Sequence, residues 1–204
     1  MKALLWQRMT AQKPFILLLL LLCIFTTLFG VRFLSSFSLL FVPTTLLLLL
    51  ITSMYEQDKQ SKWAVFVNAL PVSKKTQLFV DFLFCYGICL LAFSAISPSY
   101  FSHQNATNNT IEHFAIFAAF FSSMIWLLSL QFYVHYCPKN SNSKIYAISG
   151  VIFIILVINF PIHYYLSLVS PSAFIILIPT FFSIIPVILS FQKCVAHYNK
   201  HDIY

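Results

Sequence analysis

Six long apolar segments, separated by short polar loops, constrain the fold of this 204-residue chain more than any other feature. A helix needs about 20 mostly apolar residues to cross the hydrocarbon core of a bilayer. The six segments lie at about residues 14–34, 36–54, 77–97, 113–135, 145–165 and 171–192. Only 8% of the residues are charged, too few to cover the surface of a water-soluble domain. The sequence therefore predicts an all-α membrane protein, with six transmembrane helices in a single transmembrane domain over residues 1–204.

The positions of the basic residues predict how the chain is oriented in the membrane. Of the 12 Lys and Arg residues, all except Arg32 lie before the first segment, between the second and third, between the fourth and fifth, or after the sixth. Lys and Arg are enriched in cytoplasmic loops. We therefore expect a multi-pass protein of the cell membrane, in contact with membrane lipid, with both termini in the cytoplasm. This bias explains the net charge of +7, and we expect no nucleic-acid binding.

Several kinds of enzymatic site have no counterpart in the sequence. Three glycines are too few for a phosphate-binding loop or a dinucleotide-binding motif, and the motifs of serine hydrolases and zinc proteases do not occur. His197, His201 and Cys194 have a spacing that suits a metal, but we favour a solvated tail. The five cysteines are expected to be free thiols. We therefore expect no enzyme activity, no catalytic residue, no cofactor and no metal site.

Two features inside the apolar segments bear on function and packing. Charged residues within membrane segments are functional candidates by default, and Asp81 lies about one turn inside the third segment. We favour a capping role for Asp81, or an ion pair with Lys74 or Lys75, over contact with a substrate. In the sixth segment, Pro179 and Pro186 predict a kinked helix that packs inward.

The loop between the second and third segments, residues 55–76, carries the most informative pattern. Two acidic residues suited to a helix N-terminus come first, an apolar stripe at helical spacing follows, and a helix-ending proline and a capping serine come last. The residues that we single out are Glu56, Asp58, Lys62, Trp63, Phe66, Val67, Leu70, Pro71 and Ser73. The pattern predicts a short amphipathic helix on the cytoplasmic surface. This helix either rests on lipid or docks to a cytoplasmic partner.

The same stretch resembles the permease subunits of ABC-2-type transporters. The family pattern is an acidic residue, a tryptophan, and then Leu-Pro-Val-Ser followed by Arg or Lys; here Trp63 precedes Leu-Pro-Val-Ser-Lys-Lys at residues 70–75. The match is close over the loop and extends elsewhere only to span number and orientation. One departure is Asp81, where the family often has Lys. Within the small six-span bacterial branch, the chain is similar to the permeases of the staphylococcal phenol-soluble-modulin exporter.

The resemblance implies a permease subunit of an ATP-driven exporter that moves a hydrophobic or amphipathic substrate, amphipathic peptides among them, out of the cell. It implies that the nine residues above form a coupling helix and its flanks, docked to a separate cytoplasmic ATP-binding subunit that binds the ATP. It also implies a second permease subunit, identical or different. Residues 1–13 resemble the family's N-terminal interfacial helix. Residues 160–171 form either a re-entrant hairpin or a plain connection.

Two other functions stay open from the residues alone. An accessory or immunity-type polytopic membrane protein without transport activity would have the same topology and would need no ATPase. A membrane-embedded enzyme acting on lipids would need a cluster of acidic residues inside the membrane, which the sequence lacks.

Overall fold

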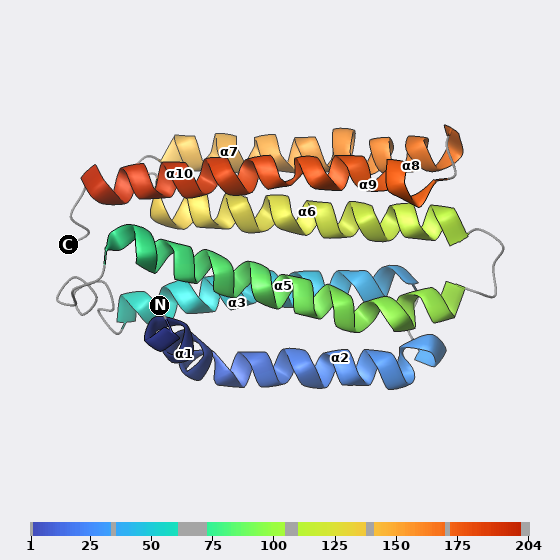
Figure 1. Cartoon of the computed structure of the whole chain (residues 1–204), viewed down its shortest axis with the longest axis horizontal. Helices are drawn as coiled ribbons and strands as arrows, with labels where there is room; N and C mark the ends of the chain where they lie inside the picture. The colour runs from blue at the N-terminus through green and yellow to red at the C-terminus, as the bar shows by residue number, and fades with distance from the viewer. Residues whose placement is uncertain are drawn as a thin grey trace.

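The computed structural model describes residues 2–33, 36–60, 73–104, 110–137, 141–169 and 172–200, and all regular structure in these ranges is helical. The helices are α1 (Lys2–Ala11), α2 (Lys13–Phe33), α3 (Ser36–Gln60), α5 (Lys74–Gln104), α6 (Thr110–Tyr136), α7 (Ser141–Phe153), the π-helix η1 (Ile154–Asn159), α8 (Phe160–Val169), α9 (Ala173–Phe182) and α10 (Ile184–Lys200). The long helices run along one common axis, and α1 and the end of α10 lie at the same end of the bundle (Figure 1). The predicted all-α class is confirmed for the described residues.

Four helical stretches are long and apolar enough to cross a membrane: Lys74–Phe101, Thr110–Tyr136, Tyr146–Val169 and Ala173–His197. Helices α1 and α2 bend by 69° at a short break, and this pair would add a fifth crossing if it counts as one broken span. The chain is therefore a multi-pass membrane protein. The count of six spans stays a prediction.

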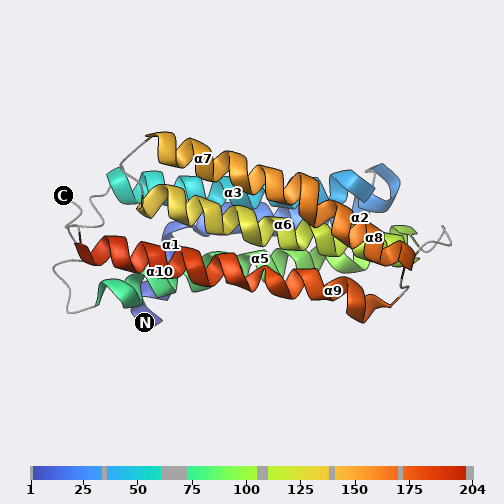
Figure 2. The same ribbon diagram turned by 90° about the horizontal axis from the view of Figure 1, so that it is seen from above.

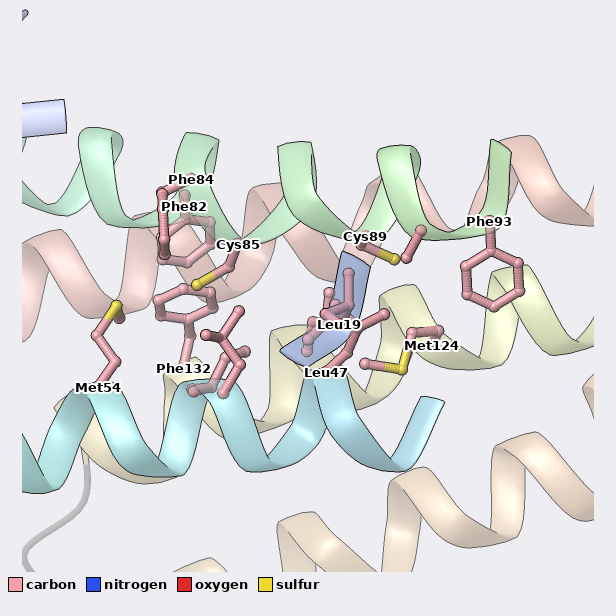
Figure 3. Close-up of a cluster of buried hydrophobic side chains, with 14 of the residues drawn as sticks. Leu19, Leu47, Met54, Phe82, Phe84, Cys85, Cys89, Phe93, Met124 and Phe132 are labelled. Carbon is pink, nitrogen blue, oxygen red and sulfur yellow. The ribbon is translucent and has the colours of Figure 1, made fainter. Parts of the chain in front are cut away.

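Helix α6 occupies a central position in the bundle. It contacts α3 and α5 on one side and α7, α8, α9 and α10 on the other (Figure 1). Its buried face toward α8 and α9 carries small residues, among them Ala115, Ala118 and Ala119, which allow helices to approach closely in lipid. Toward α5 the packing is aromatic, and the rings of Phe82 and Phe132 stack with centroids 4.0 Å apart (Figure 3).

The last apolar segment is interrupted, as its prolines predict. Helix α9 ends at Phe182, and α10 begins after Ser183. Pro186 has no N–H to donate to the carbonyl of Phe182, four residues earlier, which explains the position of the break. One face of the segment packs against α6 and α5, where Ile176, Ser183 and Cys194 are buried, whereas Phe181 and Phe182 are 62% and 61% exposed. Large apolar side chains need no protein cover where lipid surrounds them.

In two places the helices continue further than the sequence predicted. Helix α3 continues to Gln60, so Glu56 and Asp58 extend this long helix and do not open a new one. The stretch contains no Pro or Gly that would end the helix, and Glu, Gln and Lys favour it. Similarly, Phe160–Val169 forms α8 and continues the span that begins at Tyr146. The described part of the segment 160–171 is therefore mostly the last part of this helical stretch.

Candidate functional site

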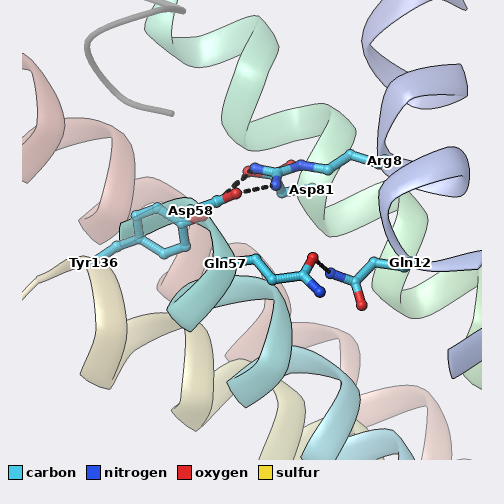
Figure 4. A network of polar contacts seen from close by, with 6 residues as sticks. All are labelled: Arg8, Gln12, Gln57, Asp58, Asp81 and Tyr136. Atoms are coloured by element: carbon cyan, nitrogen blue, oxygen red, sulfur yellow. Dashed lines mark hydrogen bonds and ion pairs between the residues drawn. The ribbon is translucent and has the colours of Figure 1, made fainter. Parts of the chain in front are cut away.

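A buried ion-pair cluster joins four helices at the end of the bundle where α1 lies (Figure 4). Arg8 on α1 donates hydrogen bonds from Nε and Nη2 to the two carboxylate oxygens of Asp81 on α5, at 2.7 Å and 3.1 Å. It also donates from Nη2 to Oδ2 of Asp58 on α3, at 2.8 Å, and from Nη1 to Oδ1 of the same residue. The hydroxyl of Tyr136, at the end of α6, donates to Oδ2 of Asp81 at 3.1 Å.

The helical spacing of α1 places Arg8 on the side that faces this cluster. Leu4, Arg8 and Gln12 are spaced four residues apart, so they lie on one side of the chain at the α1–α2 bend, and all three are buried. Trp6 and Met9 point away and are 72% and 45% exposed. The predicted interfacial helix at residues 1–13 overlaps α1, in which Arg8 faces the protein, while Lys2, Gln7 and Thr10 are exposed.

A second polar contact supports the same arrangement of helices. The side-chain amide of Gln12 donates from Nε2 to Oε1 of Gln57 on α3, at 2.7 Å. Arg8 and Gln12 therefore both bind the last turns of α3. The bent N-terminal segment is tied to α3 at two points, one charged and one neutral.

The two acidic residues of the cluster flank the segment 61–72 of the predicted coupling loop. Asp58 lies two residues before the end of α3, and Asp81 lies about two turns into α5. Between them, Ser73 caps α5: its Oγ accepts a hydrogen bond from the backbone N–H of Thr76 at 3.2 Å and contacts the Thr76 hydroxyl at 2.7 Å. The predicted capping role of Ser73 is confirmed. Arg8 thus connects the helix that enters this segment with the helix that leaves it.

The geometry of the cluster suits a structural and mechanical role. Arg8 is 5% exposed, Asp81 1% and the Asp58 side chain 19%. Taking such charges out of water is costly, and the cost is offset only when the pairing geometry is good and the remaining hydrogen-bonding positions are filled. Here the planar guanidinium binds both carboxylates in a two-bond arrangement, which is the strongest form of this contact. The arrangement fixes the relative positions of α1, α3 and α5.

The structure places three of the nine predicted coupling residues. Glu56 is exposed on α3, Ser73 caps α5, and Asp58 points into the bundle toward Arg8, although the resemblance implied that it belongs to the docked coupling helix. The remaining six lie outside the described residues: Lys62, Trp63, Phe66, Val67, Leu70 and Pro71.

The ion pair between Arg8 and Asp81 was not anticipated from the sequence. We expected Asp81 to cap a helix or to pair with Lys74 or Lys75, and the structure pairs it with Arg8, 73 positions away. Two features of the sequence could have predicted the pair. Asp81 is an acidic residue two turns inside an apolar helix, where a charge is costly without a partner. Arg8 is a basic residue in the N-terminal segment that precedes the first apolar run.

A second polar cluster lies deeper in the bundle, at the end of the π-helix. The amide of Asn159 donates to the Ala119 carbonyl at 3.1 Å and to the Ser123 hydroxyl at 2.8 Å, and it accepts from Ser122 at 2.9 Å. His163 on α8 contacts the Asn159 carbonyl at 2.8 Å. This cluster fixes η1 and α8 against α6. Asn159 is only 5% exposed, so it faces a neighbouring helix and not an open path.

Comparison with known proteins identifies the family of this chain. A family model described as "ABC-2 family transporter protein" matches residues 1–199. Comparisons with curated proteins and with solved structures give no significant match. Permeases of this family are the membrane subunits of ABC transporters, and the ATP is bound by a partner subunit. Since the match extends over nearly all of the sequence, the chain belongs to the ABC-2 transporter family and is a membrane permease of an ABC transporter.

Proposed function

We propose that this permease exports a hydrophobic or amphipathic substrate, and that residues 61–72 dock to the ATP-binding subunit while the Arg8 cluster carries the resulting motion into the membrane. The observation that supports the proposal best is the position of the cluster. Asp58 and Asp81 lie on the two helices that bracket the segment, and one guanidinium binds both.

The physical basis of coupling is a difference in affinity between two states. ATP binding shifts the partner between two conformations, and a docked segment shifts the permease in the same direction. A movement of residues 61–72 acts first on the end of α3 and on the capped start of α5. Because Arg8 holds Asp58 and Asp81 together, α3 and α5 would move as one unit, with α1 attached to them.

We also propose six membrane crossings, with both termini in the cytoplasm. A docking segment that meets an ATP-binding subunit lies in the cytoplasm. Helix α1 and the end of α10 lie at the same end of the bundle as the end of α3 and the start of α5, which flank this segment, so both termini would be cytoplasmic, with six crossings between them. Cysteine labelling in a background without the native cysteines tests this: a cysteine at Ser141 should react from the inside and one at Ser102 from the outside.

The substrate class rests on the resemblance to peptide exporters and on the predicted second and fifth spans, which by the same resemblance line the transport path. These spans are almost wholly apolar, which suits a lipid-like molecule or an amphipathic peptide and disfavours an ion. A second permease subunit, identical or different, would complete the transporter. Transport of a fluorescent amphipathic peptide into inverted vesicles, with and without ATP, tests the direction and the substrate class together.

Co-purification tests the docking segment directly. The wild-type chain should retain its cognate ATP-binding subunit in detergent, whereas the double variant Trp63→Ala with Leu70→Asp should lose it, because a buried aromatic anchor is removed and a charge is placed in the contact. Trp6→Ala is the matched control, since this exposed tryptophan lies on α1 and outside the segment.

The outcomes separate the parts of the proposal. If the wild-type chain does not associate with the ATP-binding subunit, the docking proposal as a whole is wrong. If the double variant associates as well as the wild type, docking takes place elsewhere on the permease. Equal losses in the double variant and in Trp6→Ala would point to a general effect on the membrane surface and would also contradict docking through residues 61–72.

A further inference from the structure

A groove of about 240 Å³ lies between α6, α7 and α10. Helix α6 contacts both α7 and α10, and Figure 2 shows it between them. Apolar side chains form the walls of the groove, among them Leu130 on α6, Val151 on α7 and Leu189 on α10. The groove contains one charged residue, Lys193.

Both serine hydroxyls that line the groove bond to the backbone of their own helix, and the other side chains with a polar group along the walls are Trp126, Tyr133 and Lys193. Ser129 donates from Oγ to the carbonyl of Ile125 at 2.8 Å, and Ser190 donates to the carbonyl of Val187 at 3.0 Å. A helical serine that bonds to its own backbone needs no hydrogen bond from a ligand. The interior of the groove is therefore suited to a hydrocarbon chain.

Lys193 marks the end of the groove that lies near the membrane surface. The next residue, Cys194, lies with its Sγ 3.4 Å from Sγ of Cys137, just beyond the end of α6. Pro186, which also lines the groove, is seven residues earlier on α10 and so about 10 Å deeper. The groove thus runs from a cationic end at the edge of the bundle toward an apolar interior.

Lys193 is available to a ligand. Its side chain is exposed, it forms no ion pair within the described part of the chain, and no carboxylate lines the groove. A lysine at the end of a membrane helix reaches toward the headgroup layer, and basic sites between helices on the cytoplasmic side bind anionic headgroups.

We propose that this groove binds an anionic phospholipid from the leaflet on the side of the N-terminus, with its phosphate at Lys193 and an acyl chain between α6, α7 and α10. The size of the groove argues for a lipid chain over a partner helix. A helix is about 10–12 Å wide with its side chains and would not fit into this volume, whereas a row of methylene groups would.

Native mass spectrometry tests the proposal on the purified full-length chain. The protein is incubated with phosphatidylglycerol and phosphatidylcholine of identical acyl chains at equal concentration. The wild type should retain more phosphatidylglycerol. Lys193→Gln should bind phosphatidylglycerol about fivefold more weakly, the loss expected for one lysine at an anionic membrane surface. Lys193→Arg should keep the preference, because the positive charge is retained.

Matched variants separate this site from a general charge effect. Lys13→Gln removes an exposed cation at the start of α2, outside the groove, and should leave phosphatidylglycerol binding unchanged. Val151→Trp fills the groove and should reduce binding of both lipids. Lys193→Gln carries the test even if Val151→Trp does not fold, since it changes an exposed side chain.

Three results would overturn the proposal: equal binding of the two lipids to the wild type, equal loss in Lys13→Gln and Lys193→Gln, or full lipid binding by folded Val151→Trp. Each of these leaves the docking of residues 61–72 untouched, because lipid binding is measured on the purified chain without the ATP-binding subunit.

Discussion

Arg8 and Asp81 form two hydrogen bonds, at 2.7 Å and 3.1 Å, across 73 positions of sequence. The contact connects α1, which precedes the first predicted span, to the interior of α5. Asp58 shares the same guanidinium, and Tyr136 donates to the same Asp81 carboxylate. A single arginine therefore organises the end of the bundle around the segment that we propose as the docking site.

Removal of the Asp81 charge should destabilise the protein. Asp81→Asn leaves Arg8 buried with one carboxylate fewer, and breaking a buried ion pair costs about 3–5 kcal/mol. Unfolding in detergent micelles measures the change in free energy. Glu56→Gln is the control, since this exposed carboxylate lies only two residues before Asp58 on α3. Equal stability of the two variants would show that the pair contributes little.

Substitution of Arg8 by lysine should separate charge from geometry. Arg8→Lys keeps the positive charge but loses the planar fork that binds both carboxylates at once. We expect association with the ATP-binding subunit to persist, while substrate-dependent stimulation of its ATPase falls several-fold. ATPase rates of the reconstituted complex, with and without substrate, give the ratio. Full stimulation in a folded Arg8→Lys complex would exclude a role of the two-carboxylate geometry in coupling.

Loss of the α5 cap should loosen the first turn of that helix. Ser73→Ala removes the side-chain acceptor of the Thr76 N–H and should cost about 1 kcal/mol. Ser73→Asp is the rescue variant, because its carboxylate accepts the same bond. Hydrogen exchange at Thr76 and Gln77 should rise in the alanine variant and not in the aspartate variant. Unchanged exchange in Ser73→Ala would show that the backbone bonds alone hold this turn.

The Asn159 cluster should contribute modestly to stability. Asn159→Leu removes three hydrogen bonds, but Ser122 and Ser123 still donate to the Ala119 carbonyl, at 3.1 Å and 2.6 Å. Side-chain hydrogen bonds between membrane helices average about 0.6 kcal/mol with a maximum near 1.7 kcal/mol. We therefore expect a loss of about 1–2 kcal/mol in detergent unfolding.

Thr52→Val is the matched control for this prediction, since its exposed hydroxyl bonds only within its own helix. It should have almost no effect on unfolding. A loss well above 2 kcal/mol in Asn159→Leu would indicate that the π-helix depends on this residue for its register.

Several features could be predicted from residues that are close together in the sequence. The long apolar runs, the Ser73 cap and the break before Pro186 each depend on residues within a few positions of one another. The loop pattern around Trp63 led to the ABC-2 family, which the match over residues 1–199 shows independently. Helix continuity was less predictable, because Glu56 and Asp58 suit either a new helix start or an extension of α3.

The partner of Asp81 shows why the site itself was harder to predict. Lys74 and Lys75 are close in sequence, but they lie seven and six residues before Asp81, beyond the three- or four-residue spacing at which helical side chains meet. The sequence by itself determined the membrane class, the helical character of the chain and the family, since these depend on local composition and short-range spacing. Only the tertiary structure decided that Arg8 binds Asp58 and Asp81 together and that Asn159 faces α6. Such contacts depend on how helices distant in sequence are rotated and packed against one another, and no local pattern specifies this.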